Sequence, residues 1–297
     1  MIVAPGAIGC TLHGDIVKPI TALCRTVCCA VALLPLFAHA ERPSGATYVG
    51  LSIVKNFPVV TVAVNGKPVQ LMVDMVGNGQ VSLSAEVITT LAIEPTASKD
   101  DWLDADGKKL NAARFRVAEF QIGNLVFHNI SGHEDIDAPG YRRAAVGVGH
   151  FGPSLLQGYK VVLDYKHLAM VLIPADSGRA ARYGCVGAAV PFLSQWKGEP
   201  VTRASTSFGD LTMVWDTGAP FSLLRKSKLP TDVKPRIDGQ YRSDTFDLGD
   251  SRFGPLEVLA AEFGEPAALD GFVGYNFLVK NSVCVDLPAK QLLVKRN

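Results

Sequence analysis

One order of sequence features occurs twice along this chain of 297 residues. An apolar run leads into an aspartate. It is followed by a Phe-x-x-Gly segment, then by an apolar segment that ends in glycine, and finally by an apolar run that ends in aspartate. The first copy comprises Leu71-Met72-Val73-Asp74, Phe120-Gln121-Ile122-Gly123, Val146-Gly147-Val148-Gly149 and Val161-Val162-Leu163-Asp164. The second comprises Met213-Val214-Trp215-Asp216, Phe246-Asp247-Leu248-Gly249, Phe272-Val273-Gly274 and Val283-Cys284-Val285-Asp286. The repeat predicts two copies of one structural unit.

Short alternating runs predict that these units are mainly β. Residues 59–64 alternate, so that Val60, Val62 and Val64 share a face, and Asn65-Gly66 then supplies a tight turn. One short helix is expected at 84–91, with Ser84 as its N-cap. We expect lobes at 46–174 and 186–297, joined by a polar linker at 175–185.

Composition limits the classes of function. Apolar residues make up 48% of the chain, which is enough for a substantial core. The formal net charge is +1, so no excess of positive charge favours binding to nucleic acid. The chain has no Gly-x-Ser-x-Gly serine-hydrolase motif and no phosphate-binding loop.

Residues 1–40 have the features of an export signal. Lys18 and Arg25 precede an apolar run that ends in Ala38-His39-Ala40, which predicts cleavage before Glu41. The run is shorter than the roughly 20 residues that span a bilayer, so no stable membrane insertion is expected after cleavage. An uncleaved buried helix is the alternative. We expect the mature protein in the periplasm or outside the cell.

Cysteine usage is compatible with export. Four of the six cysteines lie in the predicted signal, at Cys10, Cys24, Cys28 and Cys29. The remaining two, Cys185 and Cys284, form either one disulfide or two buried thiols. The nearest candidate for a metal site, His128 and His133 with Glu134 and Asp135, is interpreted as a solvated polar loop, and we expect no metal or other cofactor.

Asp216 lies in the segment Trp215-Asp216-Thr217-Gly218-Ala219, which an apolar-apolar-Gly segment follows. With the repeated order, this segment resembles the active-site signature of the retropepsin-like aspartic proteases. The resemblance implies an all-β fold of two tandem retropepsin-like (pepsin-type) β-barrel lobes with a cleft between them. It also implies that Asp216 and Asp74 are catalytic, that Thr217, Gly218 and Ala219 form an active-site loop, and that Gly149 and Gly274 are structural.

The chemistry explains why two aspartates are needed. Peptide hydrolysis without a metal or a protein nucleophile requires one carboxylate to take a proton from water and one carboxylic acid to polarise the carbonyl. Two adjacent carboxyl groups share one proton because both cannot easily ionise. Thr217 would hold the loops together, whereas Asp164 and Asp286 suit strand-end hydrogen bonds. Asp-Gly turns within 103–108 and 236–241 are candidate hairpin flaps over the cleft.

The first copy departs from the signature, because it has Asp74-Met75-Val76-Gly77. Met75 has no hydroxyl, and Val76 has a branched side chain where glycine is expected. Gly77 replaces that glycine only if the loop is one residue longer. Three functions stay open: an aspartic endopeptidase acting on a peptide or protein, a homologue that binds extended peptides without cutting them, and a homodimer pairing two copies of Asp216 or a structural role. We expect a monomer.

Overall fold

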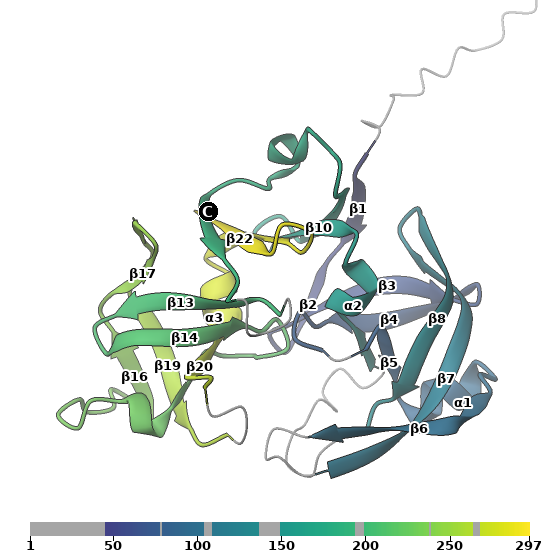
Figure 1. Cartoon of the computed structure of the whole chain (residues 1–297), viewed down its shortest axis with the longest axis horizontal. Coiled ribbons are helices and arrows are strands. Elements are labelled where there is room, and N and C mark those ends of the chain that lie inside the picture. The colour runs from purple at the N-terminus through teal and green to yellow at the C-terminus, as the bar shows by residue number, and fades with distance from the viewer. Residues whose placement is uncertain are drawn as a thin grey trace, which may run out of the picture. The chain divides into compact units, whose positions relative to one another are not determined.

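The computed structural model describes residues 45–77, 79–103, 109–136, 149–193, 199–237, 239–263 and 268–297. Residues 43–297 belong to one compact unit (Figure 1). The predicted signal at 1–40 lies outside the described residues. Within the described ranges, no helix is long and apolar enough to cross a membrane.

The first half of the chain forms an eight-stranded sheet in the order β2-β3-β4-β9-β5-β8-β7-β6. Its strands are β2 (Ser52–Val54), β3 (Phe57–Val64), β4 (Lys67–Val73), β5 (Val81–Leu83), β6 (Pro95–Leu103), β7 (Lys109–Ile122), β8 (Leu125–Glu134) and β9 (Gly149–Phe151). A further pairing of β3 with β7 closes the sheet on itself. Two short helices, α1 (Ala85–Thr90) and α2 (Pro153–Leu156), complete this half.

The second half forms another eight-stranded sheet, in the order β16-β19-β15-β20-β14-β13-β17-β18. Its strands are β13 (Val201–Thr206), β14 (Gly209–Trp215), β15 (Leu223–Arg225), β16 (Gln240–Ser243), β17 (Phe246–Leu248), β18 (Ser251–Arg252), β19 (Leu256–Ala261) and β20 (Gly271–Val273). Helix α3 (Tyr275–Leu278) follows β20, as α2 follows β9. The expected mainly β fold with two lobes is confirmed.

The centres of the two sheets have the same topology. In the first, β4 lies parallel to β9, β9 antiparallel to β5, and β5 parallel to β8. In the second, β14 lies parallel to β20, β20 antiparallel to β15, and β15 parallel to β19. Each aspartate loop connects the first and third strands of its set, so the repeat places the two loops equivalently.

A third, six-stranded sheet contains strands from both halves, in the order β1-β11-β10-β21-β22-β12. Its strands are β1 (Thr47–Gly50), β10 (Tyr159–Asp164), β11 (Ala169–Pro174), β12 (Ala188–Pro191), β21 (Asn281–Asp286) and β22 (Gln291–Arg296). Antiparallel pairing of β10 with β21 joins the halves by backbone hydrogen bonds. Side chains from all three sheets contribute to one continuous apolar core.

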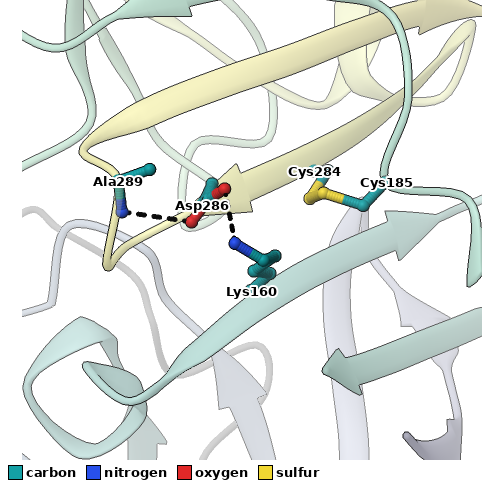
Figure 2. Close-up of a disulfide and its surroundings, with 5 residues drawn as sticks. All are labelled: Lys160, Cys185, Cys284, Asp286 and Ala289. Atoms are coloured by element: carbon teal, nitrogen blue, oxygen red, sulfur yellow. Dashed lines mark hydrogen bonds and ion pairs between the residues drawn. A yellow bond between two sulfur atoms is a disulfide. The ribbon is translucent and has the colours of Figure 1, made fainter. Parts of the chain in front are cut away.

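Cys185 and Cys284 form a disulfide, with Cα atoms 5.0 Å apart (Figure 2). Cys185 follows the 3-10 helix η2 (Ala180–Tyr183), and Cys284 lies on β21. The bond therefore attaches the expected linker to the shared sheet, and the disulfide is confirmed over the alternative of two thiols. On the same strand, Asp286 accepts a 2.8 Å hydrogen bond from Lys160 of β10.

Local sequence explains several elements. Val60, Val62 and Val64 are buried on β3 while Thr61 is exposed, as the alternation predicts. Asn65 and Gly66 both have positive φ between β3 and β4, which confirms the predicted tight turn. The hydroxyl of Ser84 caps α1 by accepting a hydrogen bond from the Val87 N–H.

Candidate active site

The Asp216 loop begins where β14 ends. The Asp216 N–H donates to the Val273 carbonyl of β20 at 3.0 Å, which attaches the loop to the neighbouring parallel strand. The Gly218 N–H donates to Asp216 Oδ1 at 2.7 Å, and the Ala219 N–H donates to the Asp216 carbonyl at 3.2 Å. One carboxylate oxygen is thereby fixed in place by the backbone of its own loop.

The Asp74 loop has the same three hydrogen bonds. The Asp74 N–H donates to Phe151 O at 3.0 Å, the Val76 N–H donates to Asp74 Oδ1 at 3.0 Å, and the Gly77 N–H donates to Asp74 O at 3.2 Å. Val76 therefore occupies the place of Gly218, and Gly77 that of Ala219. The loop has no extra residue, so Gly77 does not replace the missing glycine.

The two carboxyl groups face one point beside Gly218. A Cβ atom on this glycine would lie 3.1 Å from Asp74 Oδ2 and 3.1 Å from Asp216 Oδ1. Asp74 Oδ2 and Asp216 Oδ1 are consequently separated by no more than the sum of these two distances. Asp74 and Asp216 are 1% and 7% exposed, so water screens their mutual repulsion only weakly. The space that a side chain at Gly218 would fill is needed by the carboxyl groups.

Thr217 connects the two loops through one buried hydroxyl. Its Oγ1 donates to the Val73 carbonyl at 2.6 Å and accepts a hydrogen bond from the Met75 N–H at 2.9 Å. Met75, the counterpart of Thr217, is fully buried in the core and has no hydroxyl to return these bonds. Thr217 therefore joins the two loops through a hydroxyl that has no counterpart at position 75.

Val76 is accommodated by the second half of the chain. Its side chain packs against a small apolar cluster of Val201, Val214 and Leu269. The branched side chain thus contributes to the contact between the halves without altering the hydrogen bonds of the Asp74 loop.

The structure corrects the pairing of the repeated glycines. Phe151 and Val273 accept the equivalent loop hydrogen bonds, so the counterpart of Gly274 is Gly152. A Cβ on Gly152 would lie 2.6 Å from Asp74 O, and one on Gly274 would lie 2.8 Å from Ala219 O. Gly149 lies three residues earlier and has φ of 130°. A Cβ added to it would lie only 2.0 Å from Ser82 O and would clash. It too requires glycine, for a different contact; residues 146–148 lie outside the described residues.

Asp164 and Asp286 make the same strand-end contact. Asp164 Oδ1 accepts a hydrogen bond from the His167 N–H, and Asp286 Oδ1 accepts one from the Ala289 N–H, three residues on in each case (Figure 2). These bonds close the turns after β10 and β21, which confirms the expected strand-end role.

Both candidate flap segments lie at hairpin-like turns. Strands β6 and β7 are paired up to Leu103 and Lys109, and residues 104–108 between them lie outside the described residues. In the second segment, Ile237 and Gln240 form an isolated bridge, Gly239 has φ of 75°, and Asp238 is outside the described residues. The position of either turn over a substrate stays a prediction.

The interpretation of residues 128–135 as a solvated loop is wrong. His128 and His133 lie on β8, and although His128 is exposed, His133 is only 4% exposed. His150 on β9 is also buried and was not predicted. Among the described residues, no group of three or more His, Cys, Asp or Glu side chains is arranged to hold a metal ion.

Tyr165 adds a buried phenol near the Asp216 side of the site. Its ring lies edge-on to Tyr275, with centroids 5.7 Å apart, and the Tyr275 N–H donates to Ala219 O in the Asp216 loop. Burial raises the pKa of Tyr165 far above its ordinary value, and unfavourable electrostatic interactions with Tyr275 and Asp216 raise it further. Tyr165 therefore remains neutral at physiological pH, and its buried hydroxyl has no hydrogen-bond partner among the residues that the structure describes.

Comparison with known proteins agrees with this architecture. Residues 60–135 match the family model described as gag-polyprotein putative aspartyl protease. The aspartic proteinase from Irpex lacteus is similar in structure, with a TM-score of 0.61 and 15% sequence identity over 85% of this chain and 97% of that chain. A retropepsin-like aspartic protease from Rickettsia conorii matches 43% of this chain and 89% of its own, with 22% identity and a TM-score of 0.32. No curated protein sequence gives a significant match. The chain therefore has the two-lobed fold of an aspartic proteinase, and its resemblance to the retropepsin-like aspartic proteases is confirmed.

Proposed function

We propose that this protein is an aspartic endopeptidase in which Asp74 and Asp216 activate one water molecule for attack on a peptide bond. The observation that carries the proposal is the approach of both carboxyl groups to one point beside Gly218. Two carboxyl groups in this position share a proton, so that one acts as the base toward water and the other as the acid toward the carbonyl. The identical hydrogen bonds in the two loops support equal placement of the aspartates.

A second candidate is a protein that binds extended peptides without cutting them. It is favoured by Val76, which puts a branched side chain where the other loop has only hydrogen, and by Met75, which supplies no second hydroxyl to the contact that Thr217 makes. Peptide binding would then rely on backbone hydrogen bonds and side-chain contacts with no chemical step.

Cleavage of an unstructured protein substrate, measured from acidic to neutral pH, distinguishes the two candidates. We expect cleavage at acidic pH by the wild type, inhibition by a statine-containing peptide, and loss of cleavage in Asp216→Asn and in Asp74→Asn. Asp232→Asn is the matched control because Asp232 is exposed. Absence of cleavage by the wild type, with peptide binding retained by both active-site variants, would establish the second candidate instead.

A variant that restores the signature in the first loop tests whether the rate of cleavage increases. Met75→Thr combined with Val76→Gly supplies a second hydroxyl at the loop contact and removes the branched side chain. We expect faster cleavage of the same substrate. A double variant that folds and binds the statine peptide as tightly as the wild type, yet cleaves more slowly, would contradict this expectation.

We further propose that the mature protein begins at Glu41 and acts as a monomer in the periplasm or outside the cell. The sequence of 1–40 supports export, and the disulfide agrees with an oxidising compartment. The intact mass of protein taken from the native cell envelope tests the cleavage site, and light scattering tests the monomer. A full-length mass found only in the cytosolic fraction would contradict export.

A further inference from the structure

The two sheets differ at one edge. In the first sheet, β7 lies beyond β8, and β6 pairs with the other side of β7. In the second sheet, β16 lies beyond β19 in the equivalent place, and in the described part of the chain it is the last strand of that sheet. The chain before β16 meets its first residue in a tight turn, where the Arg236 N–H donates to Gln240 O and the Gln240 N–H donates to Ile237 O, each at 2.8 Å. The surface along the rest of β16 is not occupied by a further strand among these residues.

A surface pocket of about 470 Å³ lies at this edge. It is lined by Val233, Lys234 and Arg236 from the chain before β16, and by Arg242 and Asp244 from the end of the strand and the residue that follows it. This volume is within the range of protein sites that bind small ligands. The pocket is large enough for more than one carboxylate side chain.

Hydrogen bonds hold both walls of the pocket. On one wall, the Val233 N–H donates to Pro230 O at 3.2 Å, and the turn at Arg236 follows. On the other wall, the Asp244 N–H donates to Ser207 Oγ at 3.0 Å, and β16 is paired with β19 along its length. The basic side chains are therefore carried by backbone that is fixed on both sides of the pocket.

Positive charge predominates in the pocket. The carboxylate that lines it, Asp244, lies 3.4 Å from Arg242 Nε and is 83% exposed, and exposed ion pairs are weak. Lys234 and Arg236 are exposed as well, and neither forms an ion pair with another residue that the structure describes. Three cations therefore share one carboxylate, which leaves the pocket able to bind an anionic group.

The surrounding segment concentrates the basic residues of the second half. Residues 225–242 contain six basic and two acidic residues, in a chain whose formal net charge is +1. Two of the six are engaged elsewhere, because Lys228 pairs with Asp270 at 3.0 Å and Arg225 donates to Phe263 O at 2.7 Å. The positive charge that remains lies at and beside the pocket.

We propose that this pocket binds an acidic segment of the polypeptide substrate, with Lys234, Arg236 and Arg242 pairing with its carboxylates. The inference rests on the proposed function in one respect, which is that it names the bound segment as part of a substrate. Arg236 also begins the candidate flap at 236–241, so the pocket shares a turn with a segment that is expected to meet the substrate.

Ile237 favours a peptide over nucleic acid as the ligand. It follows Arg236 in the turn, and its side chain is 69% exposed. A peptide offers carboxylates and apolar side chains together, whereas a nucleic-acid backbone is bound by an extended basic stripe. One compact basic pocket beside an exposed apolar side chain is suited to the peptide.

Binding is tested at neutral pH with two fluorescein-labelled peptides of one Gly-Ser sequence, one with four consecutive glutamates and one with four glutamines. We expect fluorescence anisotropy to show tighter binding of the glutamate peptide by the wild type, and weaker binding at high salt because exposed charges are then screened. Lys234→Gln with Arg236→Gln should bind this peptide roughly tenfold more weakly, since two exposed pairs are lost. Lys166→Gln with Arg203→Gln removes the same charge from exposed positions elsewhere and is the matched control.

Charge reversal at the same two positions tests the pocket in the opposite direction. Lys234→Glu with Arg236→Glu should reverse the preference, so that a peptide with four lysines binds more tightly than the glutamate peptide. Thermal unfolding of each variant shows that a change of affinity does not come from a loss of the fold. Equal affinities of the wild type for the glutamate and glutamine peptides, or equal losses in the pocket variant and the control, would overturn the proposal. A thymidine oligonucleotide that binds more tightly than the glutamate peptide and depends on Lys234 and Arg236 would overturn it in favour of nucleic acid.

Cleavage separates this inference from the proposed function. Two substrates share one scissile sequence and differ in an appended segment of glutamates or glutamines, and they are compared at mildly acidic pH, above the ordinary glutamate pKa of about 4.3. In Lys234→Gln with Arg236→Gln, KM for the glutamate substrate should rise roughly tenfold at unchanged kcat. Charge-dependent binding without cleavage of either substrate would refute the proposed function and support the pocket as a peptide-binding site. Cleavage with one KM for both substrates, in the wild type and in the pocket variant, would overturn the inference and leave the proposed function standing.

Discussion

Replacing Thr217 by valine removes one hydroxyl and keeps nearly the same shape. Two buried backbone groups of the first half, the Val73 carbonyl and the Met75 N–H, then lose their partner. Leaving a buried polar group unsatisfied costs about 1–3 kcal/mol, so we expect Thr217→Val to reduce the free energy of unfolding by roughly 2–4 kcal/mol. For a chain of this size that lowers Tm by roughly 5–15 °C.

Thr217→Ser is the matched control, because it retains the hydroxyl and should remain within about 1 kcal/mol of the wild type. Thermal and denaturant unfolding give the global effect, and hydrogen exchange of the Met75 amide gives the local one. Exchange should become faster in the valine variant and stay slow in the serine variant. Equal stability of the two variants, with unchanged protection of Met75, would refute the contact made by Thr217.

Three further predictions concern stability. Cys284→Ser should destabilise the protein by up to ~4–5 kcal/mol in the chain-entropy model, since the disulfide closes a separation of 99 residues, and unfolding midpoints that are equal with and without reductant would contradict this. Gly274→Ala should cost more than about 2 kcal/mol in denaturant unfolding because its Cβ would lie 2.6 Å from the Phe221 backbone, whereas Gly158→Ala, which meets open space, should stay within about 0.5 kcal/mol. Burial holds the pKa of Tyr165 above that of an unfolded tyrosine, near 10, so the unfolded state releases its proton first as pH rises. The wild type should therefore lose more stability than Tyr165→Phe above that pH in alkaline unfolding experiments, and parallel losses would contradict the assignment.

The repeat and the alternating runs predict two mainly β units, the resemblance to the retropepsin-like aspartic proteases supplies their architecture, and neither predicts the shared six-stranded sheet. The alternation at 59–64, the Asn65-Gly66 turn and the Ser84 cap depend on neighbouring residues only, so they can be read from a sequence. The Asp74 loop was harder. The sequence alone suggests that the side chain of Val76 would clash with the second loop. The apolar cluster that receives this side chain is formed by residues more than a hundred positions away, so it cannot be recognised from the neighbouring sequence.

Gly149 is a structural glycine as predicted, but its pairing with Gly274 is wrong because a buried histidine interrupts the pattern in the true counterpart. The segment equivalent to Phe272-Val273-Gly274 is His150-Phe151-Gly152, which does not have two apolar residues before its glycine. A polar residue normally indicates an exposed strand position. His150 is nevertheless buried, and its register with Ser82 and the space at Gly77 come from contacts that are distant in sequence.

The contact made by Thr217 has a consequence for which sequences the first loop can tolerate. Its two partners are main-chain groups, which every residue supplies at position 73 and every residue except proline supplies at position 75. Position 75 can thus change its side chain without loss of the contact, whereas position 217 must carry a hydroxyl. A symmetric dimer could not have this unequal freedom: in a dimer of the first half both hydroxyls would be missing, and in a dimer of the second half both would be present.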